Sequence, residues 1–285
     1  MKLVIITGLS GSGKSIALHT LEDRGYYCID NLPVFLLPSL AAGLADREGN
    51  HFEMAAVSID ARTPLMELES IPTLLKPLKE RGIDHEIIFL EAQEEILIRR
   101  FSETRRKHPL SIDNRPLTEA IELERKLLSP FLTAADLRID TSHTNLHELR
   151  GIISSRIRDP ESGKLSLLFL SFGYKHGVPR DADFVYDARC LPNPYWQPSL
   201  RQLTGRDSPV IDFLREDPRV QELQQEITGF LERWIPLFEA DNRSYLTVAI
   251  GCTGGQHRSV FLVEQLSKHF YRHGRESQTR HRELP

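Results

Sequence analysis

The chain has 285 residues, of which 40% are hydrophobic and 27% are charged. This length exceeds one average domain and the composition is ordinary for a soluble protein, so we expect two domains and no disordered tract. The formal net charge of −4 excludes bulk electrostatic attraction to nucleic acid, so any RNA contact must come from a local patch. Three scattered cysteines and a short apolar start predict a cytoplasmic protein without disulfides, signal peptide or membrane span.

The first predicted element is a strand over Lys2–Thr7, and the pattern G-x-x-x-x-G-K-S follows it directly. This P-loop comprises Gly8, Leu9, Ser10, Gly11, Ser12, Gly13, Lys14 and Ser15. Its glycines let backbone N–H groups face a phosphate, and the next helix, over 14–24, adds the positive end of its dipole. The lysine reaches the β- and γ-phosphates, and Ser15 ligates Mg²⁺. The sequence therefore predicts a site for ATP or GTP with Mg²⁺, with a ligand-free turn as the alternative.

Short apolar runs then alternate with helical patterns as far as residue 158. The predicted strands are Tyr26–Asp30, Met54–Asp60, Glu86–Glu91 and Asp136–Asp140. The predicted helices lie near 34–46, 65–81, 94–107, 117–134 and 145–158. Such alternation indicates an α/β fold with a parallel sheet, which binds ligands at the carboxyl ends of its strands.

Three features of this region suit nucleotide chemistry. Glu91 ends a predicted strand, as a Walker B acid that binds Mg²⁺ through water does, although a carboxylate that opens a helix explains it too. Asp60 and Thr63 end another strand, where they suit either a base edge or a turn. Four arginines follow at Arg99, Arg100, Arg105 and Arg106. They are typical of the phosphate-closing lid of a small kinase, and equally of a solvated helix face.

A linker-like stretch over 158–164 precedes the second domain, in which Tyr245–Ile250 is predicted to be a buried strand. The glycine-rich residues 251–259, called the cradle below, follow this strand and lead into a helix that runs to about Arg272. A strand, a glycine loop and a helix start together bind anions, and Arg258 adds a fork suited to phosphate. Cys252 and Arg258 also have the spacing of cysteine phosphatases, in which a thiolate attacks phosphorus. Phosphate binding is favoured over catalysis by Cys252 and over a structural turn.

Two other segments, Ser171–Gly177 and Arg189–Trp196, gather hydrogen-bond donors near aromatic rings. They are candidates to complete a phosphosugar pocket, or simple turns. The tail over 268–285 has five basic residues against two acidic ones, a local charge of +3. Such a basic stripe can bind RNA phosphates, with Phe270 and Tyr271 available for stacking, whereas a helix that merely faces water is the alternative.

The P-loop, Tyr27–Pro33, Ser171–Gly177, Leu191–Pro194 and the run from Asn242 through the cradle closely resemble the bacterial RapZ family of RNase adapter proteins. These are also called YvcJ-type nucleotide-binding proteins, and the resemblance covers nearly the whole chain. It implies a kinase-like P-loop domain over residues 1–158 with weak ATPase and GTPase activity. It further implies a smaller α/β domain over 164–285 that senses glucosamine-6-phosphate. The family resemblance also implies a tetramer that presents a small regulatory RNA to an endoribonuclease and so controls amino-sugar synthesis.

Matched by position, the resemblance puts ATP at the P-loop and a guanine nucleotide at Asp60, Ala61, Arg62 and Thr63. It puts the phosphosugar at Cys252, Thr253, Gly254, Gly255 and Arg258, with Asn242 and Ser244 nearby. The RNA-binding candidates are Arg272, Arg275, Arg280 and Arg282. The chain departs from the family pattern at Tyr195, where histidine is expected, and at its end, which lacks a terminal basic cluster. A small-molecule kinase and a cysteine-dependent phosphatase remain the alternative functions.

Overall fold

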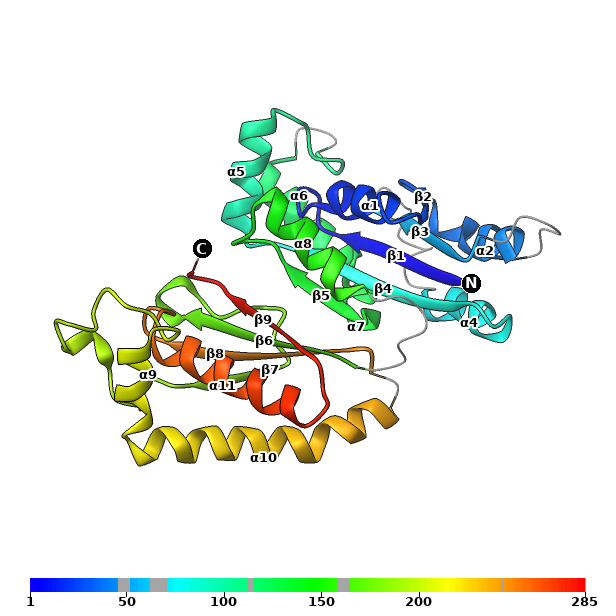
Figure 1. The fold of residues 1–285 in the computed structure, drawn as a ribbon. Coiled ribbons are helices and arrows are strands. Elements are labelled where there is room, and N and C mark those ends of the chain that lie inside the picture. Colours follow the sequence, from blue (N-terminus) through cyan, green and yellow to red (C-terminus); the bar gives the residue numbers. More distant parts are fainter. Residues whose placement is uncertain (46–51, 62–70, 112–114, 158–164, 242, 285) are drawn as a thin grey trace. The chain divides into compact units, whose positions relative to one another are not determined.

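The computed structural model describes residues 1–45, 52–61, 71–111, 115–157, 165–241 and 243–284. The chain divides into two compact units, Met1–Ser162 and Gly163–Pro285. Each unit has its own parallel sheet (Figure 1). Each also has its own hydrophobic core. Among the described helices, none combines the length and the apolar character that crossing a membrane requires.

The first unit is built on a parallel sheet whose described strands have the order β2-β3-β1-β4-β5. The strands are β1 (Lys2–Gly8), β2 (Tyr27–Ile29), β3 (Met54–Ser58), β4 (Asp84–Glu91) and β5 (Leu137–Asp140). The helices are α1 (Lys14–Glu22), η1 (Val34–Leu36), α2 (Leu37–Ala45), α4 (Ile71–Glu80), α5 (Glu94–Thr104), α6 (Leu117–Leu127), α7 (Ser129–Ala134) and α8 (Leu146–Arg156). The central strand β1 is buried along its whole length, which is why it reads as a continuous apolar run.

Helices cover both faces of this sheet. Successive side chains of a strand point to opposite faces, so β1 contributes to two layers. Leu3 and Ile5 enter the core formed with α2, α4 and α7, and α1 and α8 pack together on the other face (Figure 1). The carboxyl end of β1, where the P-loop begins, therefore lies between flanking strands whose ends are available to the same site.

The second unit has the described strand order β7-β8-β6-β9, again parallel throughout. Its strands are β6 (Ser166–Gly173), β7 (Phe184–Asp187), β8 (Tyr245–Cys252) and β9 (Ser277–His281). Its helices are η3 (Tyr174–His176), η4 (Pro194–Trp196), α9 (Ser208–Arg215), α10 (Pro218–Ala240) and α11 (Arg258–Arg272). One core joins α9, α10 and α11 to β6 and β8, with Phe169, Leu231 and Leu266 among its fully buried members.

The prediction of an α/β fold with parallel sheets is confirmed. The single helix predicted over 117–134 is wrong, because α6 ends before Pro130, which stands in the first turn of α7. Proline has no N–H and its ring clashes with the preceding turn, so it starts a helix and does not continue one. The tail is also not one stripe. The chain turns at Gly274, with φ +75°, and continues as β9 beside β6.

Candidate functional site

The P-loop leaves β1 and enters α1 in a conformation that its glycines make accessible. Gly8 has φ +133°, and a Cβ there would lie 2.0 Å from the carbonyl oxygen of Leu90 on β4. Only glycine allows this approach. Gly13 is the N-cap of α1 in the left-handed conformation, and as a glycine it has no side chain that could cap the helix. The first N–H groups of α1 are thus available to a phosphate.

Lys14 is folded over the P-loop. Its Nζ donates to the carbonyl oxygen of Gly8 at 2.7 Å, so the ammonium group lies above the loop and does not extend into solvent. The neighbouring Ser15 is exposed. The placement of both side chains suits the roles that the motif predicts for them, phosphate binding and Mg²⁺ ligation.

A buried carboxylate supports the P-loop, and the sequence analysis missed it. Glu124 of α6 is fully buried and accepts hydrogen bonds from the backbone N–H of Ser10 at 2.8 Å and its hydroxyl at 2.7 Å. His108 Nε2 lies 3.0 Å from the same carboxylate, and the N–H of Leu110 donates to His108 Nδ1. The imidazole therefore carries its one proton on Nε2, and this N–H donates a hydrogen bond to the carboxylate of Glu124.

The charge state of Glu124 follows from these contacts. Burial alone would raise its pKa, but the hydrogen bonds from His108 and Ser10 and the positive charge of Lys14 together hold that pKa below its usual value. A signal for this role was present in the sequence. Glu124 shares the apolar face of α6 with the buried Ala120 and Ile121, and a carboxylate on such a face needs buried partners.

Arg100 also supports the P-loop. Its Nη1 donates to the carbonyl oxygen of Gly11 at 2.9 Å, and its Nη2 donates to that of Thr141 at 2.7 Å. The hydroxyl of Thr141 in turn donates to the carbonyl oxygen of Ser12 at 3.0 Å. Arg100 therefore holds the loop in place. The other three lid candidates are exposed: Arg99, Arg105 and Arg106.

Glu91 ends β4 as expected, but its carboxylate is engaged by arginines. Arg138 Nη2 lies 2.6 Å from one oxygen, and Arg125 Nη1 lies 3.7 Å from the other. The side chain of Glu91 is only 3% exposed. A carboxylate with a guanidinium group on each oxygen is poorly suited to hold a Mg²⁺-bound water, so this geometry gives Glu91 an ion-pairing role.

Asp60 occupies the corresponding position on the other side of β1. It follows β3, which pairs with β1 so that Ser58 is opposite Ile6, and this places Asp60 at the carboxyl edge where the P-loop begins. With its amide nitrogen turned toward Asp60, Asn31 donates to the two carboxylate oxygens at 3.0 and 3.3 Å. Asp60 and Ala61 are buried, and Arg62 and Thr63 lie outside the described residues. Ser15 and Asp60 each offer an oxygen, the kind of ligand that Mg²⁺ prefers.

In the second unit, three adjacent strands end at one edge of the sheet. Gly173 of β6 is opposite Cys252 of β8, and Asp187 of β7 is opposite Gly251. The loops that follow these strands are the three segments singled out from the sequence. Open parallel sheets bind ligands at this carboxyl edge, so the structure brings the cradle and its two candidate neighbours together.

Arg258, the first residue of α11, is the centre of the cradle. It is 4% exposed, and its Nη1 donates to the carbonyl oxygens of Arg189 and Leu191 at 3.0 and 3.1 Å. Its Nη2 donates to the hydroxyl of Thr253 at 3.3 Å. Its Nε is buried and has no hydrogen-bond partner among the described residues. An oxygen of a bound anion would satisfy this N–H, which is otherwise costly to bury.

Cys252 shapes the loop from inside. Its sulfur accepts a hydrogen bond from the N–H of Gly255 at 3.3 Å and lies 3.2 Å from the hydroxyl of Ser259. Gly255 has φ +75°, which favours glycine at this turn. Cys252 is 2% exposed, so the thiol acts as an internal acceptor. Thr253 and Gln256 are the exposed residues of the cradle, and Gly254 is half-buried.

Ser244 lies at the opposite end of β8 from the cradle of the same chain. It precedes β8, and its carbonyl oxygen accepts a hydrogen bond from the N–H of Ser166 at the start of β6. The eight residues of β8 separate it from the cradle, roughly 25 Å along an extended strand. Asn242 lies outside the described residues.

The tail arginines differ in their surroundings. The side chain of Arg282 is 7% exposed and donates to the carbonyl oxygens of Gly173 and Gly177 at 3.2 and 2.6 Å. Arg275 forms two bonds to Glu239, at 2.6 and 3.0 Å. Arg280 is half-buried in β9, and Arg272 is exposed. Of these four residues, Arg272 is therefore the one best placed to meet a large ligand.

Comparison with solved structures gives a shikimate kinase from Acinetobacter baumannii in complex with shikimate, at a TM-score of 0.36 and 16% identity, covering 54% of this chain and 90% of that one. Because this score is low, the fold assignment depends on the strand order and register described above.

Comparison with known sequences is decisive. The chain is 57% identical over 284 residues to a nucleotide-binding protein of Nitrosococcus oceani, with 100% of both chains covered. It is 53% identical over 285 residues to one of Thioalkalivibrio sulfidiphilus, again with 100% of both covered. Residues 1–161 match the RapZ-like N-terminal domain, and residues 165–285 match the RapZ C-terminal domain. Since these two matches span almost every residue, the chain belongs to the RapZ family.

Proposed function

We propose that this chain is a regulatory protein with two anion sites. One takes ATP or GTP with Mg²⁺ at the P-loop, and the other takes glucosamine-6-phosphate at the cradle. The observation that carries the proposal is that each parallel sheet has a glycine loop and a helix start at its carboxyl edge, with a cation, Lys14 or Arg258, at the loop. The name of the relatives, nucleotide-binding protein, supports the first site.

At the P-loop, backbone N–H groups and Lys14 bind the phosphates, while Ser15 and Asp60 hold Mg²⁺ directly or through water. Mg²⁺ neutralises phosphate charge when it is bound. Glu124 and Glu91 are both engaged in buried hydrogen bonds or ion pairs, so neither is a ready general base. This arrangement favours binding with slow hydrolysis over rapid phosphoryl transfer, and hence a regulatory protein over a small-molecule kinase.

At the cradle, the start of α11 and the Nε of Arg258 bind the phosphate group. The loops after β6 and β7 supply polar groups for the sugar. Arg258 is a positioning residue as well, because its bonds to the Arg189 and Leu191 carbonyls hold the loop after β7 next to the cradle. The choice of an amino sugar comes from the family resemblance.

We expect Arg258→Ala to weaken glucosamine-6-phosphate binding by roughly 2–4 kcal/mol, because the anion loses a buried charge-assisted partner. Isothermal titration of both proteins measures the change. Arg219→Ala serves as the control, since Arg219 is 62% exposed and pairs with Asp217. Equal affinities for wild type and Arg258→Ala would show that the sugar phosphate does not bind at the cradle.

Cys252→Ser distinguishes the sensor from a phosphatase. The sensor needs only an acceptor at this position, so the hydroxyl should preserve binding with a small loss. A phosphatase would lose its activity, because the thiolate is the nucleophile. If the wild type releases phosphate and Cys252→Ser does not, the protein is a phosphatase and the sensor proposal is wrong.

We also propose that the chain binds a small regulatory RNA and presents it to an endoribonuclease, as a tetramer in the cytoplasm. Among the tail arginines, the exposed Arg272 is the primary candidate for a phosphate contact. Tyr271 beside it is 72% exposed and offers a ring on which a base can stack.

Arg272→Ala should lower RNA affinity and reduce the slope of log affinity against log salt by about one, because one phosphate contact releases on the order of one counterion. Filter binding at several salt concentrations measures both quantities. Arg150→Ala, exposed on α8 in the first unit, is the matched control. An unchanged slope in Arg272→Ala would place the RNA elsewhere.

A further inference from the structure

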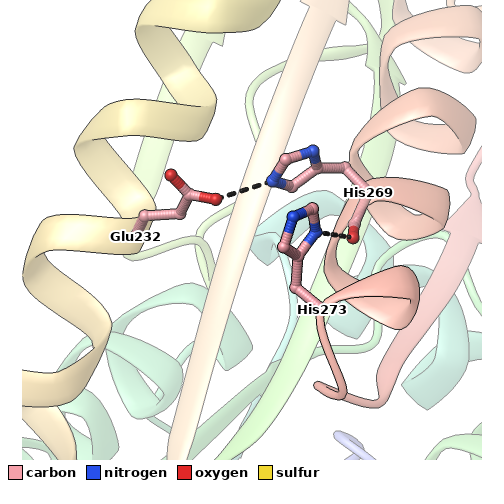
Figure 2. A group of neighbouring side chains, drawn as sticks. All are labelled: Glu232, His269 and His273. Carbon is pink, nitrogen blue, oxygen red and sulfur yellow. Dashed lines mark hydrogen bonds and ion pairs between the residues drawn. The ribbon is translucent and has the colours of Figure 1, made fainter.

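Three metal-ligating side chains meet where α10 and α11 lie side by side (Figure 2). Glu232 comes from α10, and His269 and His273 come from the last turn and the C-cap of α11. One potential ligand atom from each lies within 4.8 Å of the other two. Because the cradle is at the start of α11, this cluster is at the opposite end of the helix and separate from the proposed phosphosugar site.

The hydrogen bonds of the two imidazoles suit metal binding. His273 Nδ1 lies 2.8 Å from the carbonyl oxygen of His269. Because a carbonyl oxygen can only accept, Nδ1 of His273 is the donor, and Nε2 of His273 therefore carries the lone pair that a metal needs. Figure 2 shows this second nitrogen on the side of the His269 ring. His269 Nε2 lies 2.7 Å from an oxygen of Glu232, and the two rings stack at 4.2 Å between centroids.

The backbone at these three positions is fixed by packing. Leu231 and Ile235 flank Glu232 on α10 and are fully buried, and Leu266 and Phe270 anchor α11 in the same core. One turn beyond the cluster, Arg275 pairs with Glu239 and ties the end of α11 to α10. Ligands on helices that are already packed lose little entropy when they close on an ion.

We propose that Glu232, His269 and His273 form a site for a divalent transition-metal ion of the zinc class. Two imidazoles and one carboxylate are typical zinc ligands, and a water in the fourth position completes a tetrahedron. With bonds of about 2.1 Å, the ligand atoms of a tetrahedral site lie about 3.4 Å apart. The side chain of Glu232 is 48% exposed and that of His269 is 28% exposed. Both therefore have room to move until their ligand atoms, now within 4.8 Å of one another, reach the tetrahedral separation.

Charge and proton balance agree with this assignment. The carbonyl end of α11 carries partial negative charge, which favours a cation near His269 and His273. On binding, the ion takes the lone pair of Nε2 of His269, so the one proton of the neutral ring moves to Nδ1, and a second proton, if the ring carries one, goes to solvent. Mg²⁺ and Ca²⁺ prefer oxygen ligands alone and should not compete. The bound ion would cross-link α10 to α11 across their solvent-facing side.

Titration of untagged, chelator-stripped full-length chain with ZnCl₂ tests the site, in buffer with excess Mg²⁺ and no nucleotide. Isothermal titration should give a site with one Zn²⁺ per chain. His269→Ala and His273→Ala should each weaken it by more than the roughly 10- to 100-fold that changes to outer-shell partners cost. His147→Ala, at an exposed position on α8, should bind as wild type does.

A second measurement uses Co²⁺, whose visible absorption is strong in a tetrahedral site and weak in water. Wild type and His147→Ala should develop this absorption, and Glu232→Gln combined with His273→Gln should not. Far-UV circular dichroism checks that these surface variants remain folded. The proposal is overturned if the double variant binds Zn²⁺ and Co²⁺ as wild type does, if His147→Ala loses the site equally, or if Mg²⁺ displaces the Zn²⁺.

Discussion

Replacing Lys14 by alanine is expected to abolish detectable binding of ATP and GTP while the fold stays intact. The ammonium group lies over the P-loop, with Nζ 2.7 Å from the Gly8 carbonyl oxygen, where β- and γ-phosphate oxygens would be its partners. Each charge-assisted bond contributes about 1.5–3 kcal/mol. The loss of two such bonds predicts an affinity at least about a hundredfold lower, measured by isothermal titration with each nucleotide.

Lys76→Ala is the matched control for this variant. Lys76 is 77% exposed on α4 and faces Glu80 at 3.9 Å, so its removal should leave nucleotide affinity unchanged. Thermal unfolding of both variants should resemble that of the wild type. If Lys14→Ala binds ATP as tightly as the wild type, the P-loop is not the nucleotide site.

Replacing Glu124 by alanine is expected to destabilise the first unit by about 3–5 kcal/mol, because three buried hydrogen-bond donors lose their acceptor at a cost of about 1–3 kcal/mol each. The donors that lose their acceptor are the backbone N–H of Ser10, the hydroxyl of Ser10 and the Nε2–H of His108. For a unit of this size the loss corresponds to a fall in thermal midpoint of roughly 6–20 °C. ATP binding should weaken as well, because Ser10 belongs to the P-loop.

Glu122→Ala on the same helix separates this effect from helix propensity. Glu122 is exposed, so its removal should change the free energy of unfolding by no more than about 0.5 kcal/mol. The double variant His108→Ala with Glu124→Ala should lose less than the sum of the two single losses, because the two residues share one network. A midpoint for Glu124→Ala equal to that of Glu122→Ala would mean that the carboxylate does not hold the loop.

The strand, loop and helix of the P-loop and of the cradle could be predicted from the sequence because their determinants are contiguous. The strand, the glycines and the helix start of the P-loop all lie within Lys2–Glu22, and those of the cradle lie within 245–272. Glycine spacing and strand patterning are encoded over such short distances. The parallel sheets followed from the alternation of strands and helices in the same way.

The partners of buried charges could not be predicted, because they depend on which faces pack together. Glu124 and Ser10 are separated by 114 residues, and nothing local to either shows the contact. Glu91 appeared suited to Mg²⁺ until β5 and α6 placed Arg138 and Arg125 beside it. The basic tail makes Arg282 a candidate for binding RNA, whereas the pairing of β9 with β6 directs its side chain to carbonyl groups at the end of β6 and in the loop after it.

Hydrogen exchange of backbone amides, followed by mass spectrometry on the full chain with each ligand in turn, tests the presence of two separate anion sites most directly. Amides that bind a phosphate become protected from exchange. ATP with Mg²⁺ should slow exchange over residues 8–15 and leave 251–259 unchanged, and glucosamine-6-phosphate should do the reverse. Protection of the same segment by both ligands, or of neither segment by either, would contradict the account.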